Sequence, residues 1–417
     1  MTKKLDDYVE KVCVEAKLAS KSISTADYNA KDLALLVIAD KIRKSKKEIL
    51  AANQKDLKAG VNLDDALLDR LTLNSSRIES MALGLEEVAS ISDPIGEITN
   101  LTYRPSGIQV GRMRVPIGVV AVIYESRPNV TADVSALCIK AGNAVILKGG
   151  SEATHSNASI LKCVHYGLRK YSLPQNTAQL VKKGRDVTSV LLKKDEYIDV
   201  LVPRGGKGLI EAVSKYASMP VIKHLDGVCH VFVDSAADLS KALDVVINSK
   251  TQRYGTCNTM ETLLVSQAIA EAFCSSLYPK LIEMGVEIRG CPRAIQFDKR
   301  VKTASNTDWY EEYLGPILSV KIVDSIDEAI THIEKYGSRH TDCIVTEDFS
   351  RARHFLKVVD SSSVMINTST RFADGYEYGL GAEVGISTDK IHARGPVGLE
   401  GLTSQKWVVF GDGHIRS

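Results

Sequence analysis

From Gly118 onward, short apolar runs of strand length alternate with segments of helical character, and this alternation restricts the fold more than any other feature of the sequence. The segments 237–249 and 326–334 have the length and periodicity of helices. The strand-sized runs are 119–124, 144–147, 200–202, 231–233, 263–265, 317–323 and 343–346. Alternating strands and helices form crossover units around a mainly parallel sheet. The sequence therefore predicts an α/β fold.

The first hundred residues have a different pattern, which predicts a helical layer. Apolar residues recur at helical spacing from Leu33 to Ile42, among charged residues. Two capping boxes predict helix starts, because a serine followed by a glutamate three residues later can satisfy the free amides of a first turn. They are Ser45 with Glu48 and Ser76 with Glu79.

A length of 417 residues predicts two to three domains. A turn at Asp226 and Gly227 precedes a second run of strands and helices, so we place the main boundary there. The expected domains are residues 1–225, completed by 390–417, and residues 226–389. Residues 98–116 have the pattern of a hairpin that leaves the main body and pairs with another subunit. The alternative is an ordinary edge hairpin packed on its own domain.

Composition excludes several classes of protein. The 53 Lys and Arg residues nearly balance the 51 Asp and Glu residues, so the overall field does not predict a nucleic-acid partner. We expect no membrane span and a cytoplasmic protein, because the sequence lacks an 18-residue uncharged apolar run and a signal peptide. The eight cysteines are scattered without a CxxC pair, which predicts reduced thiols and no zinc ribbon.

The first segment of chemical interest follows the apolar run 119–124. Ligands of parallel sheets gather beyond the carboxyl ends of strands, which places Asn129 and Lys148 at a cleft edge. Asn129 would donate to an oxyanion, and Lys148 to a ribose hydroxyl or a phosphate. The alternative is that Asn129 forms a turn and that Lys148 is a solvated strand-end residue.

A second segment is the glycine-rich turn Pro203 to Gly208, which follows an apolar run and opens a helix-like stretch. Gly205 and Gly206 are candidates for phosphate binding, because helix N-termini attract anions. The turn is neither GxGxxG nor a Walker A loop, which disfavours a kinase or an ATPase. A tight turn that needs glycine only for its backbone angles is the alternative.

The third segment contains the candidate nucleophile, Cys257. It lies in a polar, glycine-bearing turn before an apolar strand, whereas Cys138 and Cys274 have apolar helical neighbours. A thiolate needs a lowered pKa, which a cation such as Arg253 or exposed backbone amides would provide. The alternative is a buried, inert cysteine.

The histidines do not indicate a hydrolase or a metalloprotease. The sequence lacks G-x-S-x-G and His-Glu-x-x-His. His224 and His230 are six residues apart, which is a poor spacing for a metal pair. We therefore expect no metal site.

Taken together, these segments resemble the aldehyde dehydrogenase superfamily and, within it, the family of glutamate-5-semialdehyde dehydrogenases, also called gamma-glutamyl phosphate reductases. The resemblance spans essentially the whole chain. The wider likeness lies in 141–148 and 311–316. The narrower likeness lies in 124–131, 198–199, 203–206, 256–259, 369–372 and 392–396.

The resemblance implies two mainly parallel, Rossmann-like domains and a small oligomerisation hairpin, with a nicotinamide between a nucleotide-binding domain, 1–225, and a catalytic domain, 226–389. Cys257 matches the nucleophile, Asn129 the oxyanion-holding asparagine, Lys148 the cofactor-ribose lysine and Glu312 the carboxylate that binds the nicotinamide ribose. Three departures stand out. Fewer residues separate Asn129 from Lys148 than in the wider superfamily, Leu314 replaces a residue that is usually aromatic, and His224 lies nearest the position of the missing general-base glutamate.

The missing glutamate fits reduction, because a reductase that starts from an acyl phosphate must keep water away from its thioester. The resemblance thus implies NADPH-dependent reduction of L-glutamyl 5-phosphate to the semialdehyde, in proline biosynthesis. NADPH is favoured because Ser151 stands where the superfamily often has a carboxylate that holds the 2′-hydroxyl, although Glu152 is adjacent. Alternatives are an NAD-dependent, aldehyde-oxidising dehydrogenase and a catalytically silent scaffold of the same fold.

The implied substrate is anionic at both ends, so its site needs cations. Arg127, Arg253 and Arg371 are the candidates, each with the alternative of a structural ion pair. Expected partners are the small-molecule substrate, further copies of the chain in a homo-oligomer, and a glutamate 5-kinase through functional coupling.

Overall fold

The structure is a computed structural model that describes residues 2–60, 63, 65–182, 184 and 186–416. The chain forms two compact units. Unit 1 comprises 1–223, 379–385 and 397–417, and unit 2 comprises 224–378 and 386–396. The expected boundary was 225/226, and the expected C-terminal segment of the first domain began at 390.

Unit 1 is built around the parallel sheet β5-β4-β3-β6, with all pairs in parallel register. The strands are β3 (Val119–Tyr124), β4 (Ala144–Gly149), β5 (Ala178–Leu180) and β6 (Val200–Arg204). Every residue of β3 and β4 is buried. Strands covered on both faces need continuous rather than alternating apolar sequence, which explains the uninterrupted run at 119–124.

Helices cover this sheet. One face packs on α1 (Thr2–Ile23), α8 (Asp186–Leu191) and α9 (Lys207–Tyr216), whose apolar residues share a core with Val119, Ala121 and Ile123 of β3. The remaining helices of the unit are α2 (Tyr28–Lys44), α3 (Lys46–Ala59), α4 (Asp65–Leu71), α5 (Ser75–Ser90), α6 (Asn129–Lys140) and α7 (Thr154–Lys170). The helical layer predicted for the first hundred residues is therefore present.

The helix start predicted at Ser45 is confirmed, but neither of the two predicted capping boxes forms. Ser45 precedes α3, but its side chain makes no capping bond, because its backbone (φ −92°, ψ 11°) lacks the extended conformation that points an N-cap oxygen at the first turn. At the second position the cap is Asn74, which is extended and accepts a hydrogen bond from Arg77 N. Ser76 lies inside the first turn of α5 and donates to Asn74 Oδ1.

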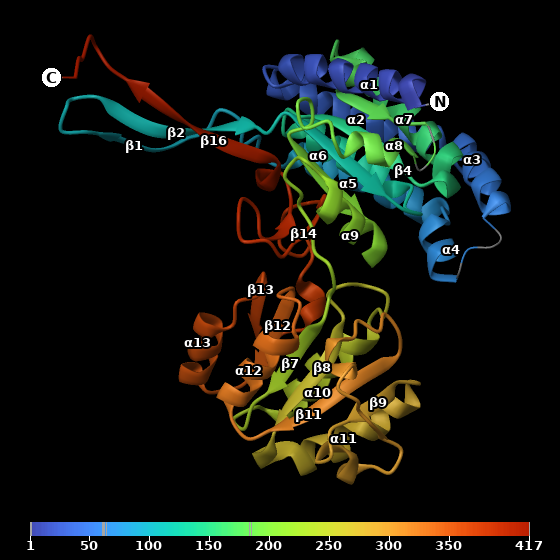
Figure 1. Ribbon diagram of the computed structural model, residues 1–417, viewed down its shortest axis with the longest axis vertical. Coiled ribbons are helices and arrows are strands. Elements are labelled where there is room, and N and C mark those ends of the chain that lie inside the picture. The colour runs from blue at the N-terminus through green and yellow to red at the C-terminus, as the bar shows by residue number, and fades with distance from the viewer. Residues whose placement is uncertain (1, 61–62, 64, 183, 185, 417) are drawn as a thin grey trace. The chain divides into compact units, whose positions relative to one another are not determined.

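An antiparallel arm belongs to unit 1. Its hairpin is β1 (Ile98–Tyr103) and β2 (Gln109–Pro116), within the predicted range 98–116. The late strand β16 (Thr403–Phe410) pairs with β2 along its whole length, from Thr403 opposite Pro116 to Phe410 opposite Gln109. Figure 1 shows β16, in red, beside the blue-green hairpin. Tyr103, Trp407 and Val409 on this arm are each more than half exposed.

Unit 2 contains a larger parallel sheet, ordered β10-β9-β11-β8-β7-β12-β13 among the described residues. The strands are β7 (Cys229–Val233), β8 (Met260–Ser266), β9 (Glu287–Gly290), β10 (Lys302–Thr303), β11 (Ile317–Val323), β12 (Thr341–Val345) and β13 (Ser363–Ile366). The short strands β14 (Gly385–Ser387) and β15 (Gly395–Val397) pair separately.

This sheet also lies between two helical layers. One core joins β7, β8 and β11 to α10 (Leu239–Thr251) and α11 (Ala270–Glu283). The other core, with Phe232 and Leu264, joins α12 (Ile326–Tyr336) and α13 (Phe349–Val358). The predicted α/β fold with mainly parallel sheets is confirmed. No helix in the described part of the chain is long and apolar enough to span a bilayer.

Candidate active site

Three side chains meet at the amino edge of the sheet in unit 2. His224 precedes β7, Cys257 precedes β8 and His340 precedes β12. In the sheet order, β7 lies between β8 and β12. Because these parallel strands begin at the same edge, the loops that enter them converge, although the residues are far apart in sequence. One ligand-type atom of each residue lies within 4.8 Å of the others.

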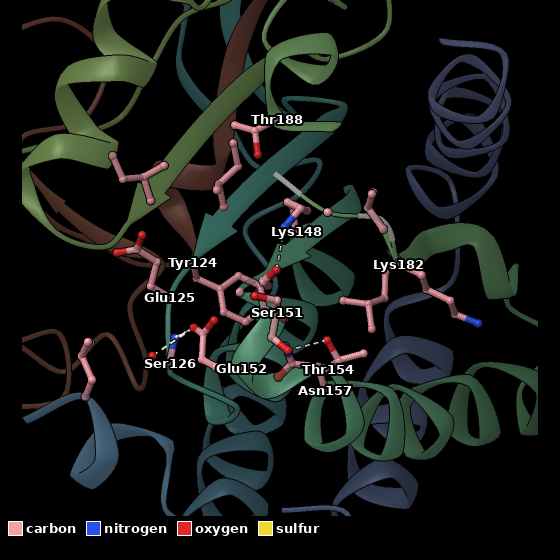
Figure 2. Close-up of a pocket in the computed structure, with 18 of the residues that line it drawn as sticks. Tyr124, Glu125, Ser126, Lys148, Ser151, Glu152, Thr154, Asn157, Lys182 and Thr188 are labelled. Carbon is pink, nitrogen blue, oxygen red and sulfur yellow. Dashed lines mark hydrogen bonds between the residues drawn. The ribbon is translucent and has the colours of Figure 1, made fainter. Parts of the chain in front are cut away.

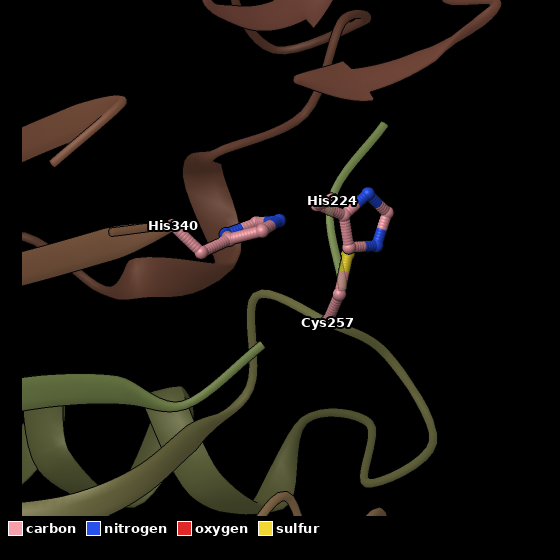
Figure 3. A group of neighbouring side chains, drawn as sticks. All are labelled: His224, Cys257 and His340. Carbon is pink, nitrogen blue, oxygen red and sulfur yellow. The ribbon is translucent and has the colours of Figure 1, made fainter. Parts of the chain in front are cut away.

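Hydrogen bonds to the protein orient both imidazoles. His224 Nδ1 lies 3.1 Å from the carbonyl oxygen of Ile386, and His340 Nδ1 lies 2.9 Å from Thr341 Oγ1. The two rings meet edge to face with their centroids 5.3 Å apart. Figure 3 shows the His340 ring extending toward Cys257 and His224. The cluster thus consists of one sulfur and two fixed rings.

The thiol of Cys257 is electrostatically different from the buried cysteines. Burial alone would raise the pKa of Cys257, but the charges and polar contacts of both the His340 and His224 rings lower it well below its ordinary value. Burial raises the pKa of the Cys138 thiol far above its ordinary value and that of Cys343 to about 12. Cys257 is half-buried, whereas those two are fully buried. Only a thiolate is a strong nucleophile, so the cluster favours Cys257 as the reactive cysteine.

The backbone around Cys257 is packed tightly. A Cβ atom at Gly227 would lie 2.0 Å from the Cys257 carbonyl oxygen, so only glycine fits at this approach. The Cys229 thiol donates to that same oxygen at 3.1 Å. The loop that carries Cys257 is therefore fixed from the β7 side.

Glu312 lies on the loop before β11, which neighbours β8 at the same edge. Burial and the negative charge of Cys257 raise its pKa, while a hydrogen bond from Gly227 N opposes the increase. The next residues of this loop are fixed by Glu261, whose Oε1 accepts from Leu314 N at 3.2 Å. The structure therefore brings Glu312 near Cys257.

Two of the three candidate arginines lie by the Cys257 loop. Arg371 donates through Nη1 to Thr256 Oγ1 and through Nε to Gln252 Oε1, both at 2.8 Å. Burial and the charge of Arg253 lower the pKa of Arg371, so the two guanidinium groups are close enough to repel each other. Arg127 lies in unit 1, in the turn between β3 and α6. Unit 2 therefore offers two cations beside its thiolate.

Unit 1 has a cavity of about 740 Å³ at the carboxyl ends of β3, β4 and β5. Lys148, Ser151 and Glu152 line it, with Lys182 on the β5 side (Figure 2). The Lys148 ammonium donates to the Gly149 carbonyl oxygen at 2.8 Å. The Glu152 carboxylate accepts from the amide and hydroxyl of Ser126, at 2.7 and 2.9 Å.

The cavity has the form of a site for a small organic ligand. It is a largely apolar recess with a few polar groups at one side, the usual form of a cofactor site. A Cβ atom at Gly149 would lie 2.2 Å from Asn157 Nδ2, so a larger residue at this position in the cavity wall would collide with Asn157. Lys148 and Ser151 contribute polar groups to the lining, and Leu209 and Ala212 contribute apolar surface.

The other sequence candidates lie in unit 1 near this cavity. Gly205 and Gly206 precede α9 and contact Glu125, whose Oε2 accepts from Gly206 N. The α9 residues that line the cavity, however, begin at Gly208. Asn129 begins α6, and its Nδ2 donates to Asp133 Oδ2 at 2.9 Å. Burial raises the pKa of Asp133 to about 6.

Sequence reasoning missed His340 and left the role of His224 open. Sequence distance gives no signal, because 83 positions separate Cys257 from His340. The signal that could have found His340 is that His224, Cys257 and His340 each precede a strand-like run. These residues can be grouped only when the three strands are known to be neighbours in the sheet, and the sequence did not provide that order.

Comparison with known proteins assigns nearly the whole chain to one family. The sequence model of the aldehyde dehydrogenase family matches residues 2–289 and 300–408. The chain belongs to the aldehyde dehydrogenase family. Membership confirms the resemblance and implies a nicotinamide cofactor, in agreement with the cavity in unit 1.

Solved structures show which members of the family the chain resembles. It is 41% identical to gamma-glutamyl phosphate reductase of Thermotoga maritima, with a TM-score of 0.95, covering 98% of this chain and 100% of that chain. It is 33% identical to gamma-glutamyl phosphate reductase of Saccharomyces cerevisiae, with a TM-score of 0.55 and 98% of each chain covered. An engineered glycolyl-CoA reductase with bound NADP⁺ is similar in fold alone, at 17% identity, a TM-score of 0.69 and 96% coverage of each chain.

Proposed function

We propose that this aldehyde dehydrogenase reduces L-glutamyl 5-phosphate to L-glutamate 5-semialdehyde and phosphate, with NADPH, as a step of proline biosynthesis. The observation that carries the proposal is the half-buried Cys257 with a lowered pKa, held between two imidazoles. The likeness to two gamma-glutamyl phosphate reductases supports the choice of substrate.

The first step is attack of the Cys257 thiolate on the acyl carbon. A carbon–sulfur bond forms, the carbon–oxygen bond to phosphate breaks, and the departing phosphate needs one proton. An imidazolium, His224 or His340, is the proton donor at this site, since both rings face the sulfur. Expulsion of phosphate thus consumes the one proton of the overall reaction.

The second step returns the sulfur to its starting state. The bound nicotinamide supplies the hydride that reduces the thioester. The hemithioacetal oxyanion then collapses, so that the carbon–sulfur bond breaks and Cys257 leaves as a thiolate without taking a proton. His224 lies nearest the position where the superfamily has its general-base glutamate. The absence of a carboxylate there fits this cycle, because a carboxylate would activate water against the thioester.

We assign the remaining residues as follows. Asn129 and the Cys257 amide stabilise the oxyanion; removing one such donor costs about 3 to 4 kcal/mol of barrier in other enzymes. Asp133 orients the Asn129 amide by its hydrogen bond. Arg253 and Arg371 bind the anionic substrate, with Arg127 as a further candidate.

The wider setting also belongs to the proposal. An acyl phosphate is readily hydrolysed, so we infer functional coupling to a glutamate 5-kinase. The exposed arm of β1, β2 and β16 supports a homo-oligomer, because its outer strands have apolar residues open to solvent. Free thiols suit a reducing compartment, and all eight cysteines are unpaired.

The assay that tests the function runs the reaction in reverse. We expect NADPH formation from NADP⁺, the semialdehyde and phosphate, and no turnover when phosphate is omitted. Turnover without phosphate would instead support an aldehyde-oxidising dehydrogenase. Absence of turnover under every condition would support a silent scaffold.

Alkylation of Cys257 has a predicted pH profile. Because its pKa is lowered well below that of a free thiol, the thiolate persists to lower pH, and the iodoacetamide rate should reach its plateau at a lower pH than for a free cysteine. Removing either ring by His224→Ala or His340→Ala takes away one of the groups that lower this pKa, so the midpoint should move upward by about one to three units. Mass spectrometry of the Cys257 peptide, with a chelator present, gives the rate. Coincident midpoints in the wild type and both variants would contradict the assigned role of the rings.

Coenzyme preference is predicted from the cavity. Ser151 is exposed, so Ser151→Glu should fold normally while adding a carboxylate beside Lys148. Repulsion of the 2′-phosphate should raise the KM for NADPH about 10- to 100-fold, and the KM for NADH should stay equal or fall. Ser151→Gln is the matched neutral control. Equal effects of Glu and Gln would show that charge at this position does not select the coenzyme.

A further inference from the structure

The Cys257 cluster has a feature that points beyond the proposed reaction. His340 is fully buried, and its Nε2 has no hydrogen-bond partner among the described residues. A buried polar atom without a partner destabilises the folded protein, so its presence needs an explanation. In Figure 3 this ring extends toward the sulfur of Cys257, so the orphaned nitrogen belongs to the cluster.

The hydrogen bonds of the two rings are those of metal-ligating histidines. Such a histidine usually donates its second ring N–H to a carbonyl or another oxygen, which fixes the tautomer. His224 Nδ1 faces the carbonyl of Ile386, and His340 Nδ1 faces Thr341 Oγ1. If each Nδ1 donates to that oxygen, the lone pair of each neutral ring lies on Nε2.

The ligand types and spacing fit zinc. Two imidazole nitrogens and one thiolate are ligands that Zn²⁺ prefers, and three protein ligands leave a fourth position open. Tetrahedral bond lengths place such ligand atoms about 3.3 to 3.6 Å from one another. The atoms here lie within 4.8 Å, and His224 and Cys257 are on loops outside regular elements, so a small inward movement completes the set.

We propose that His224, Cys257 and His340 bind one Zn²⁺ ion, with water or an anion as the fourth ligand. The metal–sulfur bond uses the electron pair that would attack the substrate, and protons held by the three groups are released to water. Zinc would therefore block the sulfur reversibly and shield it from alkylation. The effect on turnover rests on the proposed function, whereas binding itself does not. This proposal departs from the sequence-based expectation of no metal site.

The test uses the full-length protein, freed of metal with a chelator, and reads binding without turnover. Zn²⁺ titration by calorimetry should give one site per chain. Co²⁺ in its place should produce the near-ultraviolet thiolate-to-cobalt charge-transfer band, displaced by Zn²⁺. Cys257→Ser should abolish the band, and His340→Gln should weaken zinc affinity at least about 10-fold.

The controls are a second accessible thiol and a second histidine beside a carboxylate. Cys291 is half-buried elsewhere in unit 2, and His354 is exposed 3.4 Å from Asp327. Cys291→Ser and His354→Ala should leave the band and affinity unchanged. The proposal fails if wild type shows no charge-transfer band, or if Cys257→Ser keeps it. If the protein binds zinc but its metal-free form has no reductase activity, the proposed function is refuted and the zinc site is not.

Discussion

Replacing Cys257 with alanine is expected to reduce phosphate-dependent turnover by about four to six orders of magnitude, as loss of a catalytic nucleophile does in other enzymes. Its neighbour Cys229 cannot take its place, because desolvation raises the pKa of that thiol well above the ordinary value and leaves it protonated. The measurement is kcat for NADPH formation from the semialdehyde and phosphate.

Two controls show whether the loss of turnover is specific to the Cys257 thiol. Cys291→Ser removes a thiol of similar exposure and should retain normal kcat. NADPH binding to Cys257→Ala, followed by coenzyme fluorescence, should be retained, because the cavity is lined by residues of unit 1. A variant that binds NADPH and still turns over within tenfold of wild type would eliminate the thioester mechanism.

Lys250→Met is expected to destabilise unit 2 by about 3 to 5 kcal/mol. Lys250 and Glu261 form an ion pair at 2.5 Å with both side chains fully buried. Burial lowers the pKa of Lys250 and raises that of Glu261 to about 7, so the pair only partly recovers what each charge loses on leaving water. Without Lys250, an uncompensated carboxylate remains in the core.

Urea unfolding in mildly alkaline buffer, where Glu261 is charged, measures this cost. A Trp407→Phe background leaves Trp309, buried in unit 2, as the reporter. The double variant Lys250→Met/Glu261→Gln should recover most of the loss, because the glutamine oxygen can still accept from Leu314 N. A double variant as unstable as Lys250→Met would show that the cost came from packing rather than charge.

The fold could be predicted where burial alone dictates sequence. Strands covered on both faces read as continuous apolar runs, so β3 and β11 match their predicted limits. Helix caps could not be predicted, because a capping oxygen works only on an extended backbone. Ser45 ends one helix and precedes the next, which leaves no room for that conformation.

The site could be predicted only in part, because local sequence identifies single residues but not which of them meet in space. Lys148 and Cys257 were identifiable from their own neighbours in sequence. The rule that ligands gather at carboxyl ends of strands holds for the cavity in unit 1 but not for Cys257, which lies at an amino edge. His340 reaches Cys257 only because β7 separates β8 from β12, and strand order depends on long-range packing.

The pairing of β16 with β2 also bears on biosynthesis. The ribosome makes the hairpin early, but its third strand emerges only after all of unit 2. Throughout that interval β2 carries an open row of backbone donors and acceptors, which invites association with other nascent chains. Codon changes that slow translation between the two strands should therefore lower the yield of native protein without altering any residue.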